Sequence, residues 1–227
     1  DVLLASCRHR LVEANRYRVA IDAVRAIDDS AGELLVDQLQ SEVSVVVNGT
    51  VRTLGHMADM SVVGDLIERL GGDDEAARDN AIELLENMAE SELLSRLLPL
   101  LSSDDDEQVQ AAREIAGWEE VDLERVLEYL LETGGAWTQV AALWCAVQWQ
   151  YRSLSERADI VLAEPARGIM GEMGEYRGDS AMSEEVQPLT TMEKITFLRG
   201  SSFFAALPLE ELYQVALSIQ EESVQAG

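Results

Sequence analysis

The feature that most constrains this chain is a tight turn that recurs every 31 residues. Asp73, Asp104 and Gly135 mark equivalent positions in the three turns, and each turn separates two segments whose apolar residues recur at helical spacing. A period of about 30 residues that consists of a helix, a turn and a second helix is typical of an α-solenoid, in which each pair buries its apolar face only by stacking on its neighbours. The sequence therefore predicts an all-α solenoid, and a bundle of helices of similar length is the alternative.

Apolar stripes mark the individual helices. Within residues 123–131, leucine and valine recur at positions i, i+3, i+4, i+7 and i+8, which places them on one side of a helix. The same spacing predicts helices within residues 77–88, 93–98 and 209–219. Two longer helices, at about residues 3–27 and 33–57, are predicted before the first turn.

One segment of the second long helix also fits a strand. Val43–Val47 is rich in β-branched residues, and Asn48 and Gly49 follow it, which suits a hairpin turn. The helix is the preferred prediction because the surrounding residues keep helical spacing, and the hairpin is the alternative.

Glycine, aspartate and serine mark the helix ends. We expect Gly71-Gly72 and Gly134-Gly135 to supply the left-handed conformation that ends a helix. Asp73-Asp74 and Ser102–Asp104 are expected to accept hydrogen bonds from the free N–H groups that begin the next helix.

The repeating segments resemble HEAT repeats. In the first copy, Leu66–Leu70 precede a Gly-Gly-Asp-Asp turn, and Ala77, Arg78 and Ala81 follow it. In the second copy, the apolar helix at residues 97–101 precedes an acidic turn. The match is degenerate, because Ala77 stands where the family has valine and glutamine stands at position 110 where it has arginine. The resemblance is clearest in residues 60–150, and it implies a right-handed solenoid that binds protein partners, capped by the two long helices.

The C-terminal residues resemble a different family. After a polar stretch at 174–189, which we interpret as a linker, residues 192–199 and the run Phe-Phe-Ala-Ala-Leu-Pro-Leu-Glu-Glu-Leu are similar to the leader helices of cyclic-nucleotide-binding domains. The residues that fit this leader motif are Phe204, Leu207, Glu210, Glu211 and Leu212. The predicted organisation is a HEAT-like helical domain at 1–173, the linker at 174–189, and the start of a cyclic-nucleotide-binding domain at 190–227.

The resemblance implies no cofactor for these residues themselves. In that family a later cassette holds the ribose and the cyclic phosphate, and the 227 residues contain no such cassette. Cyclic nucleotide is therefore expected only in a longer parent protein. HEAT segments followed by such a domain also resemble the tail of bacterial proteins that carry an ATP/ADP-translocase-like membrane region, which gives a second hypothesis, the cytosolic regulatory tail of a nucleotide transporter.

Charge excludes several classes of partner. Asp and Glu number 43 against 17 Lys and Arg, so the formal net charge is -26. Such a surface repels nucleic-acid phosphates and anionic lipid headgroups. No apolar run reaches the roughly 20 residues that span a bilayer, so no membrane insertion of this segment is expected. We expect a cytoplasmic protein, at the cytosolic face of a membrane if the transporter hypothesis holds; Cys7 and Cys145 are expected to be buried, reduced thiols.

The sequence favours a non-enzymatic function. His9 and His56 lie on separate predicted helices, and no serine or cysteine has the context of a nucleophile, so no catalytic residue is expected; a chromophore-lyase-like enzyme is the alternative. No metal site is expected either, because the acidic clusters lack the calcium-loop pattern and suit helix N-termini. The candidate contacts for a protein partner are three tryptophans whose alternative role is core packing: Trp137, Trp144 and Trp149.

Overall fold

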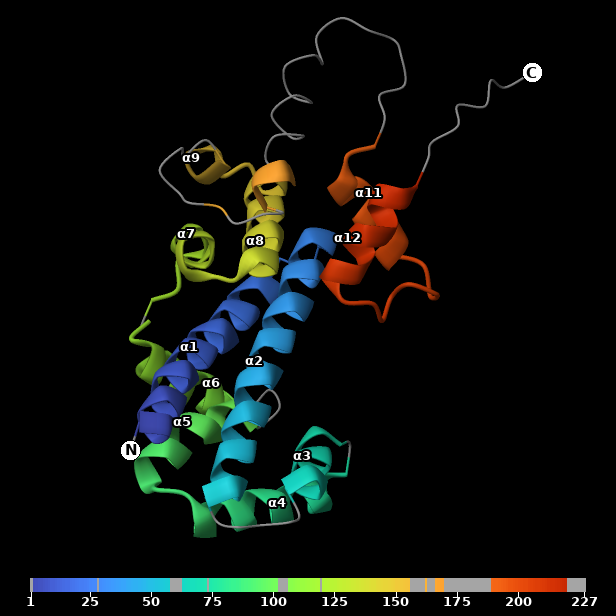
Figure 1. Ribbon diagram of the computed structural model, residues 1–227. Coiled ribbons are helices and arrows are strands. Elements are labelled where there is room, and N and C mark those ends of the chain that lie inside the picture. Colours follow the sequence, from blue (N-terminus) through green and yellow to red (C-terminus); the bar gives the residue numbers. More distant parts are fainter. Residues whose placement is uncertain are drawn as a thin grey trace, which may run out of the picture. The chain divides into compact units, whose positions relative to one another are not determined.

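The computed structural model describes residues 2–27, 29–57, 63–72, 74–101, 106–118, 120–155, 162, 166–169 and 189–219. All regular secondary structure in these ranges is helical, which confirms the predicted all-α class with its C-terminal helical extension. The helices are α1 (Val2–Arg25), α2 (Ser30–Met57), α3 (Val63–Gly71), α4 (Glu75–Met88), α5 (Ser91–Leu101), α6 (Asp106–Ala116), α7 (Leu123–Thr133), α8 (Ala136–Gln148), α9 (Arg152–Ser155), α11 (Thr191–Arg199) and α12 (Leu209–Ser218) (Figure 1).

The chain divides into two compact units. The first comprises Asp1–Ala26 and Leu39–Val121, and the second comprises Ile27–Gln38 and Asp122–Gly227. Helix α2 therefore contributes its first residues to the second unit and the remainder to the first. The predicted division at residues 173 and 190 stays a prediction, and the predicted linker lies outside the described residues except for Leu189.

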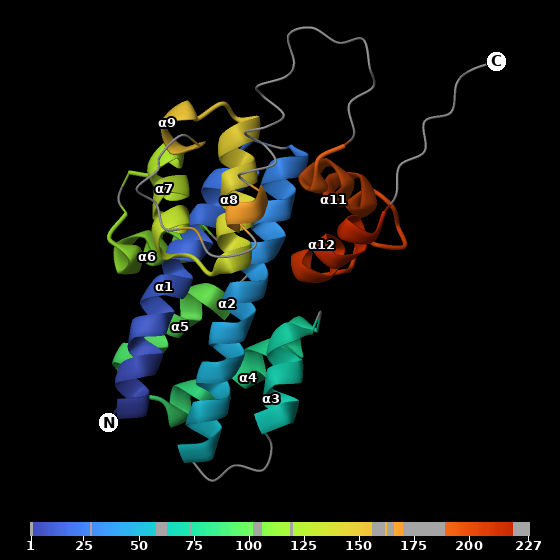
Figure 2. The same cartoon turned by 45° about the horizontal axis from the view of Figure 1, so that its top comes forward.

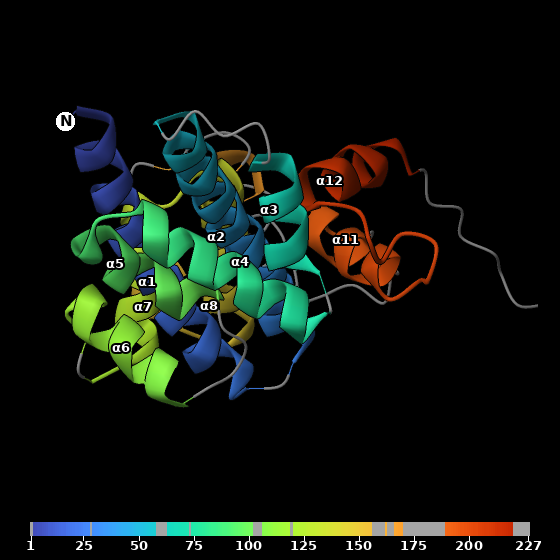
Figure 3. The same ribbon diagram turned by 90° about the horizontal axis from the view of Figure 1, so that it is seen from below.

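The first unit is built from the helix pairs that the 31-residue period predicts. Helix α3 packs on α4 and α5 packs on α6, while α1 packs against both α5 and α6 (Figure 3). The apolar stripes of α1–α5 meet in one core, whose fully buried side chains include Leu11, Ala14, Val51, Ala81, Leu85 and Leu97. Ala112 and Ala116 of α6 form a separate, smaller cluster with Val19 of α1.

The helix ends follow the sequence predictions in part. Asp74 caps α4, since its carboxylate accepts a hydrogen bond from the Ala77 N–H at 3.2 Å. The left-handed conformation predicted for Gly71-Gly72 and Gly134-Gly135 is wrong. Among the described residues, Gly117, with φ at 70°, is the only glycine with positive φ. Ser102–Asp104 lies outside the described residues. The preferred helix over residues 33–57 is confirmed, because α2 continues through Asn48, and the alternative of a hairpin there is wrong.

The second unit contains the pairs α7–α8 and α11–α12 (Figure 2). Helix α8 is buried continuously from Thr138 to Ala146, as expected of a helix that is apolar on every side. Gly134 joins α7 to α8 with φ at -68°. Glycine is needed there for space, since an added Cβ would lie 2.4 Å from the Leu130 carbonyl oxygen and 2.8 Å from Thr138 Cγ2.

A buried asparagine fixes α1 on α5. The side-chain amide of Asn15 donates to the carbonyl oxygens of Leu11 at 2.7 Å and of Arg96 at 2.8 Å. Arg96 lies three residues before Pro99, whose missing N–H frees the carbonyl of Ser95, not that of Arg96, in the hydrogen-bond ladder of α5. Asn15 therefore joins the side chain of α1 to the backbone of α5 through the Arg96 carbonyl oxygen.

Ion pairs flank this contact along α1. Arg8 pairs with Glu90, and Asp22 pairs with Arg113 of α6 at 2.8 Å. Because these pairs are partly exposed, each one contributes little stability, and their main effect is to select one register of α1.

We expect Asn15→Ala to lower the free energy of unfolding of the first unit by about 1–3 kcal/mol, because a buried interhelical hydrogen bond is lost and a small cavity is left. Asn87→Ala is the matched control: this exposed asparagine donates only to the Glu83 carbonyl of its own helix. Its effect should stay within about 0.5 kcal/mol. Urea unfolding monitored by circular dichroism checks both, and equal effects of the two substitutions would contradict the assignment.

Candidate protein-binding groove and C-terminal helices

A groove opens in the first unit between α2, α3 and α5. Its volume is about 390 Å³, and it is lined by residues from the middle of α2 and from the C-terminal ends of α3 and α5. The apolar members are Val43, Val47, Ile67, Leu70, Leu100 and Leu101; the remaining ones are Ser44, Asn48, Glu68 and Gly71.

The apolar floor of the groove follows from the helix patterns. Val47 and Leu101 are buried and join the core, whereas Ile67, Leu70 and Leu100 are half-buried at its edge. Apolar residues on α2 exceed what its core-facing side requires, and Val45 is exposed. Sequence reasoning missed this groove; the β-branched run at 43–47 was its only signal, and we interpreted that run as a question of helix or hairpin.

The rim of the groove is acidic. Glu68 is the one ionisable residue among the lining residues, and its side chain is exposed. Helices α3 and α5 end at Gly71 and Leu101, so two helix C-termini lie at the groove. The C-terminal end of a helix carries a partial negative charge, which adds to that of Glu68.

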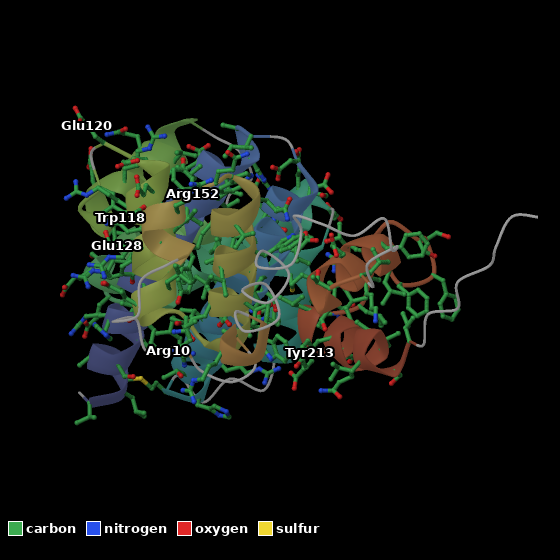
Figure 4. All side chains as sticks on the ribbon, turned by 90° about the horizontal axis from the view of Figure 1, so that it is seen from above. Arg10, Trp118, Glu120, Glu128, Arg152 and Tyr213 are labelled. Carbon is green, nitrogen blue, oxygen red and sulfur yellow. The ribbon has the colours of Figure 1, made fainter. Side chains whose placement is uncertain are left out.

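The structure does not bring the three candidate tryptophans into one exposed cluster. Trp144 is 6% exposed and packs in the core of the second unit. Trp137 is half-buried, and its ring contacts the Tyr213 ring edge-on with centroids 5.3 Å apart. Tyr213 lies on α12 (Figure 4). Trp149 is half-buried and donates its indole N–H to the Asp29 carboxylate. Their role as partner contacts stays a prediction.

The leader-motif residues lie in and after the turn that joins α11 to α12. Phe204 and Leu207 are half-buried in that turn, and Leu212 is fully buried on α12. Glu210 and Glu211 are exposed in the first turn of α12, where carboxylates stabilise the helix dipole. Helix α11 begins with a capping box between Thr190 and Glu193.

Arg199 anchors this helix pair within the second unit. Its guanidinium donates to the Leu207 carbonyl oxygen at 2.8 Å and forms an ion pair with Asp37 at the start of α2. Burial lowers the pKa of Arg199, and Glu33 opposes that shift. Sequence reasoning missed this residue because its partner lies 162 positions away, and no local pattern announces such a contact.

Two phenylalanines of the same region face solvent. Phe197 on α11 is 78% exposed, and Phe203, in the turn between α11 and α12, is 83% exposed. The Phe203 ring contacts the Phe204 ring edge-on, with centroids 4.9 Å apart. Large exposed aromatic side chains of this kind are typical of surfaces that another domain or protein covers.

The cysteines and histidines show no catalytic arrangement in the described structure. The Cys145 thiol is buried and donates to the Ala31 carbonyl oxygen at 3.2 Å; burial raises its pKa, and Asp29 raises it further. Cys7 is free and only half-buried, so the prediction of two buried thiols is wrong for Cys7, which lies near the exposed first turn of α1. His9 is exposed beside Glu13, and His56 is exposed in the last turn of α2.

The described residues contain no group of three or more His, Cys, Asp or Glu side chains that could hold a metal ion. The acidic turn that begins at Asp104 lies outside that search. No helix among the residues searched is long and apolar enough to cross a membrane.

Comparison with protein families identifies one part of the chain. A family model of HEAT repeats matches residues 32–116, so these residues form a HEAT-repeat region. No curated protein and no solved structure matches the chain. The match covers most of α2, which we expected to be a cap, and ends with α6, so the third predicted copy, α7–α8, lies outside it.

We expect a thiol reagent such as 5,5′-dithiobis(2-nitrobenzoic acid) to modify one cysteine of the folded chain quickly, namely Cys7. Cys145 should react only on unfolding, because burial keeps its thiol protonated and inaccessible. The raised pKa also means that the unfolded chain releases the Cys145 proton first, so stability should fall as the pH rises above the ordinary value of 9.0. The Cys145→Ser variant is the control that assigns the slow thiol, and fast reaction of both thiols would contradict the burial.

Proposed function

We propose that this chain is a non-enzymatic scaffold that mediates protein–protein or interdomain contacts and couples them to a C-terminal cyclic-nucleotide-sensing module. The HEAT-repeat region at residues 32–116 carries the proposal, because stacked helix pairs of this type offer extended surfaces for protein partners. The groove between α2, α3 and α5 lies within that region and gives such a partner an apolar place to dock.

The C-terminal helices support the coupling part of the proposal. Phe197 and Phe203 leave an apolar surface on the pair α11–α12, which resembles the leader helices of a cyclic-nucleotide-binding domain. A module that packs on these rings would displace α11, and the contact between Arg199 and Asp37 would pass that displacement to the start of α2. The Trp137–Tyr213 contact links α12 to α8 in the same unit.

The non-enzymatic assignment rests on chemistry. A catalytic cysteine needs a lowered pKa and access to substrate, whereas Cys145 has a raised pKa and is buried. The transporter-tail hypothesis depends on sequence before Asp1 and stays a prediction.

Photo-crosslinking tests both parts of the proposal in the protein that the complete reading frame encodes. A p-benzoylphenylalanine at position 203, where the exposed phenylalanine leaves room for the added benzoyl group, should crosslink to a C-terminal module of the same protein. p-Benzoylphenylalanine at position 44, on the rim of the groove, should crosslink to a separate protein. That protein, once purified, should bind this chain again without crosslinking. Position 86, an exposed glutamate on α4, is the control that should give neither product.

Absence of any discrete product from position 44 would contradict the scaffold function. Absence of an intramolecular product from position 203, or a reading frame without a phosphate-binding cassette, would contradict the coupling to cyclic nucleotide.

A further inference from the structure

We propose that the groove between α2, α3 and α5 binds a basic amphipathic helix of a protein partner. An apolar side chain of that helix would occupy the floor, and its lysines and arginines would lie at the acidic rim. The inference rests on the proposed scaffold function and adds the chemistry of the partner and the place where it docks.

The floor of the groove suits one or two apolar side chains. Val47 and Leu101 form its buried base, and Ile67 and Leu70 present half-buried carbons at the edge. The volume of about 390 Å³ lies at the lower end of the range of about 300–1,000 Å³ that ligand pockets occupy. Docking one helix face into an apolar groove needs anchors at i and i+3 or i+4, and a space of this size accommodates them.

The edge of the groove leaves room for a second backbone. Gly71, the last residue of α3, lines the groove, and apart from its chain neighbours and the backbone of its own helix no atom lies within 4 Å of the position that its Cβ would take. Its φ is outside the left-handed region, so backbone conformation does not require glycine at this position. The missing side chain therefore keeps the mouth open.

Electrostatics selects the charge of the partner. The lining residues include one carboxylate, that of Glu68, and no lysine, arginine or histidine. The C-terminal ends of α3 and α5 add partial negative charge at the same place. A cationic helix is attracted to this rim, whereas an acidic peptide is repelled.

The same charges argue against the other occupants. Nucleic acid and anionic membranes are repelled by a chain with a formal net charge of -26. A second copy of the chain brings that net charge with it. The most basic described helix, α1, already uses Arg8 for its pair with Glu90 and Arg16 for the Ala116 carbonyl oxygen. The occupant that suits the groove is therefore a basic segment of a different protein.

Fluorescence anisotropy with designed peptides tests the inference on the purified chain. Three labelled helical peptides of about 18 residues, roughly 27 Å long, would share one leucine face and differ only in a polar face of lysine and arginine, of glutamine, or of glutamate. The basic peptide should bind most tightly at physiological salt, and a basic peptide with alanine in place of its leucines should lose at least about tenfold in affinity, equal to about 1.4 kcal/mol.

Paired variants locate the binding on the groove. Gly71→Trp fills the mouth and should weaken binding of the basic peptide at least about tenfold. Gly64→Trp is the matched control, because Gly64 lies on the same helix with equally open space but does not line the groove. The affinity of this variant for the basic peptide should stay within about twofold of that of the unchanged chain. Glu68→Lys should weaken binding, whereas Glu86→Lys on α4 should not. Circular dichroism melts confirm that each variant is folded.

Four outcomes would overturn the inference: no binding of any peptide, equal binding of the acidic and basic peptides, binding that survives loss of the leucines, or equal effects of Gly71→Trp and Gly64→Trp. None of these outcomes would contradict the scaffold function itself. A crosslink from position 44 would still support that function, with a partner of different chemistry. Protection of residues 43–48 from hydrogen exchange by the basic peptide would support the groove as its site.

Discussion

The first unit depends on the fact that a HEAT-type helix pair cannot bury its apolar face alone. Helices α3–α6 form two such pairs, and α1 packs on α5 and α6, where the pairs would otherwise leave apolar surface. Leu11, Ala14 and Val19 of α1 are fully buried as a result. Burial of apolar area is the largest favourable contribution to folding, so the first unit gains its stability mainly from this shared core.

Polar contacts then choose one arrangement among many that bury similar area. Asn15 is fully buried, and its two amide hydrogen bonds are satisfied only when α1 lies in register with α5. Apolar contacts are non-directional, whereas a buried amide without partners costs about 1–3 kcal/mol. In the second unit Arg199 has a comparable role, since it holds the turn before α12 and the start of α2 at the same time. The groove is a place in the first unit where apolar residues of α2 exceed what the core uses, and that excess is what makes it suitable for a partner.

Helical periodicity predicted the helices and the pairs, because the apolar face of a helix is a local property of its sequence. The turn at Asp74 was predictable for the same reason, since capping depends on residues three positions apart. What covers an apolar face is not a local property. The contacts of Asn15 with Arg96 and of Arg199 with Asp37 join residues far apart in the chain, and the groove exists only where three helices meet. Gly134 shows a further limit, because glycine was expected there for its backbone freedom and is instead required by the close approach of Leu130 and Thr138.

Helix α1 packs on both α5 and α6, and we expect these three helices to unfold as one cooperative unit. Native-state hydrogen exchange measures this directly as the free energy of opening at each amide. We expect the amides of residues 14–24 in α1 to open with a free energy within about 1 kcal/mol of those in α5, because both helices unfold together. Amides of α1 that open about 3 kcal/mol more easily while α5 stays protected would show that α1 is a loosely attached helix and would contradict it.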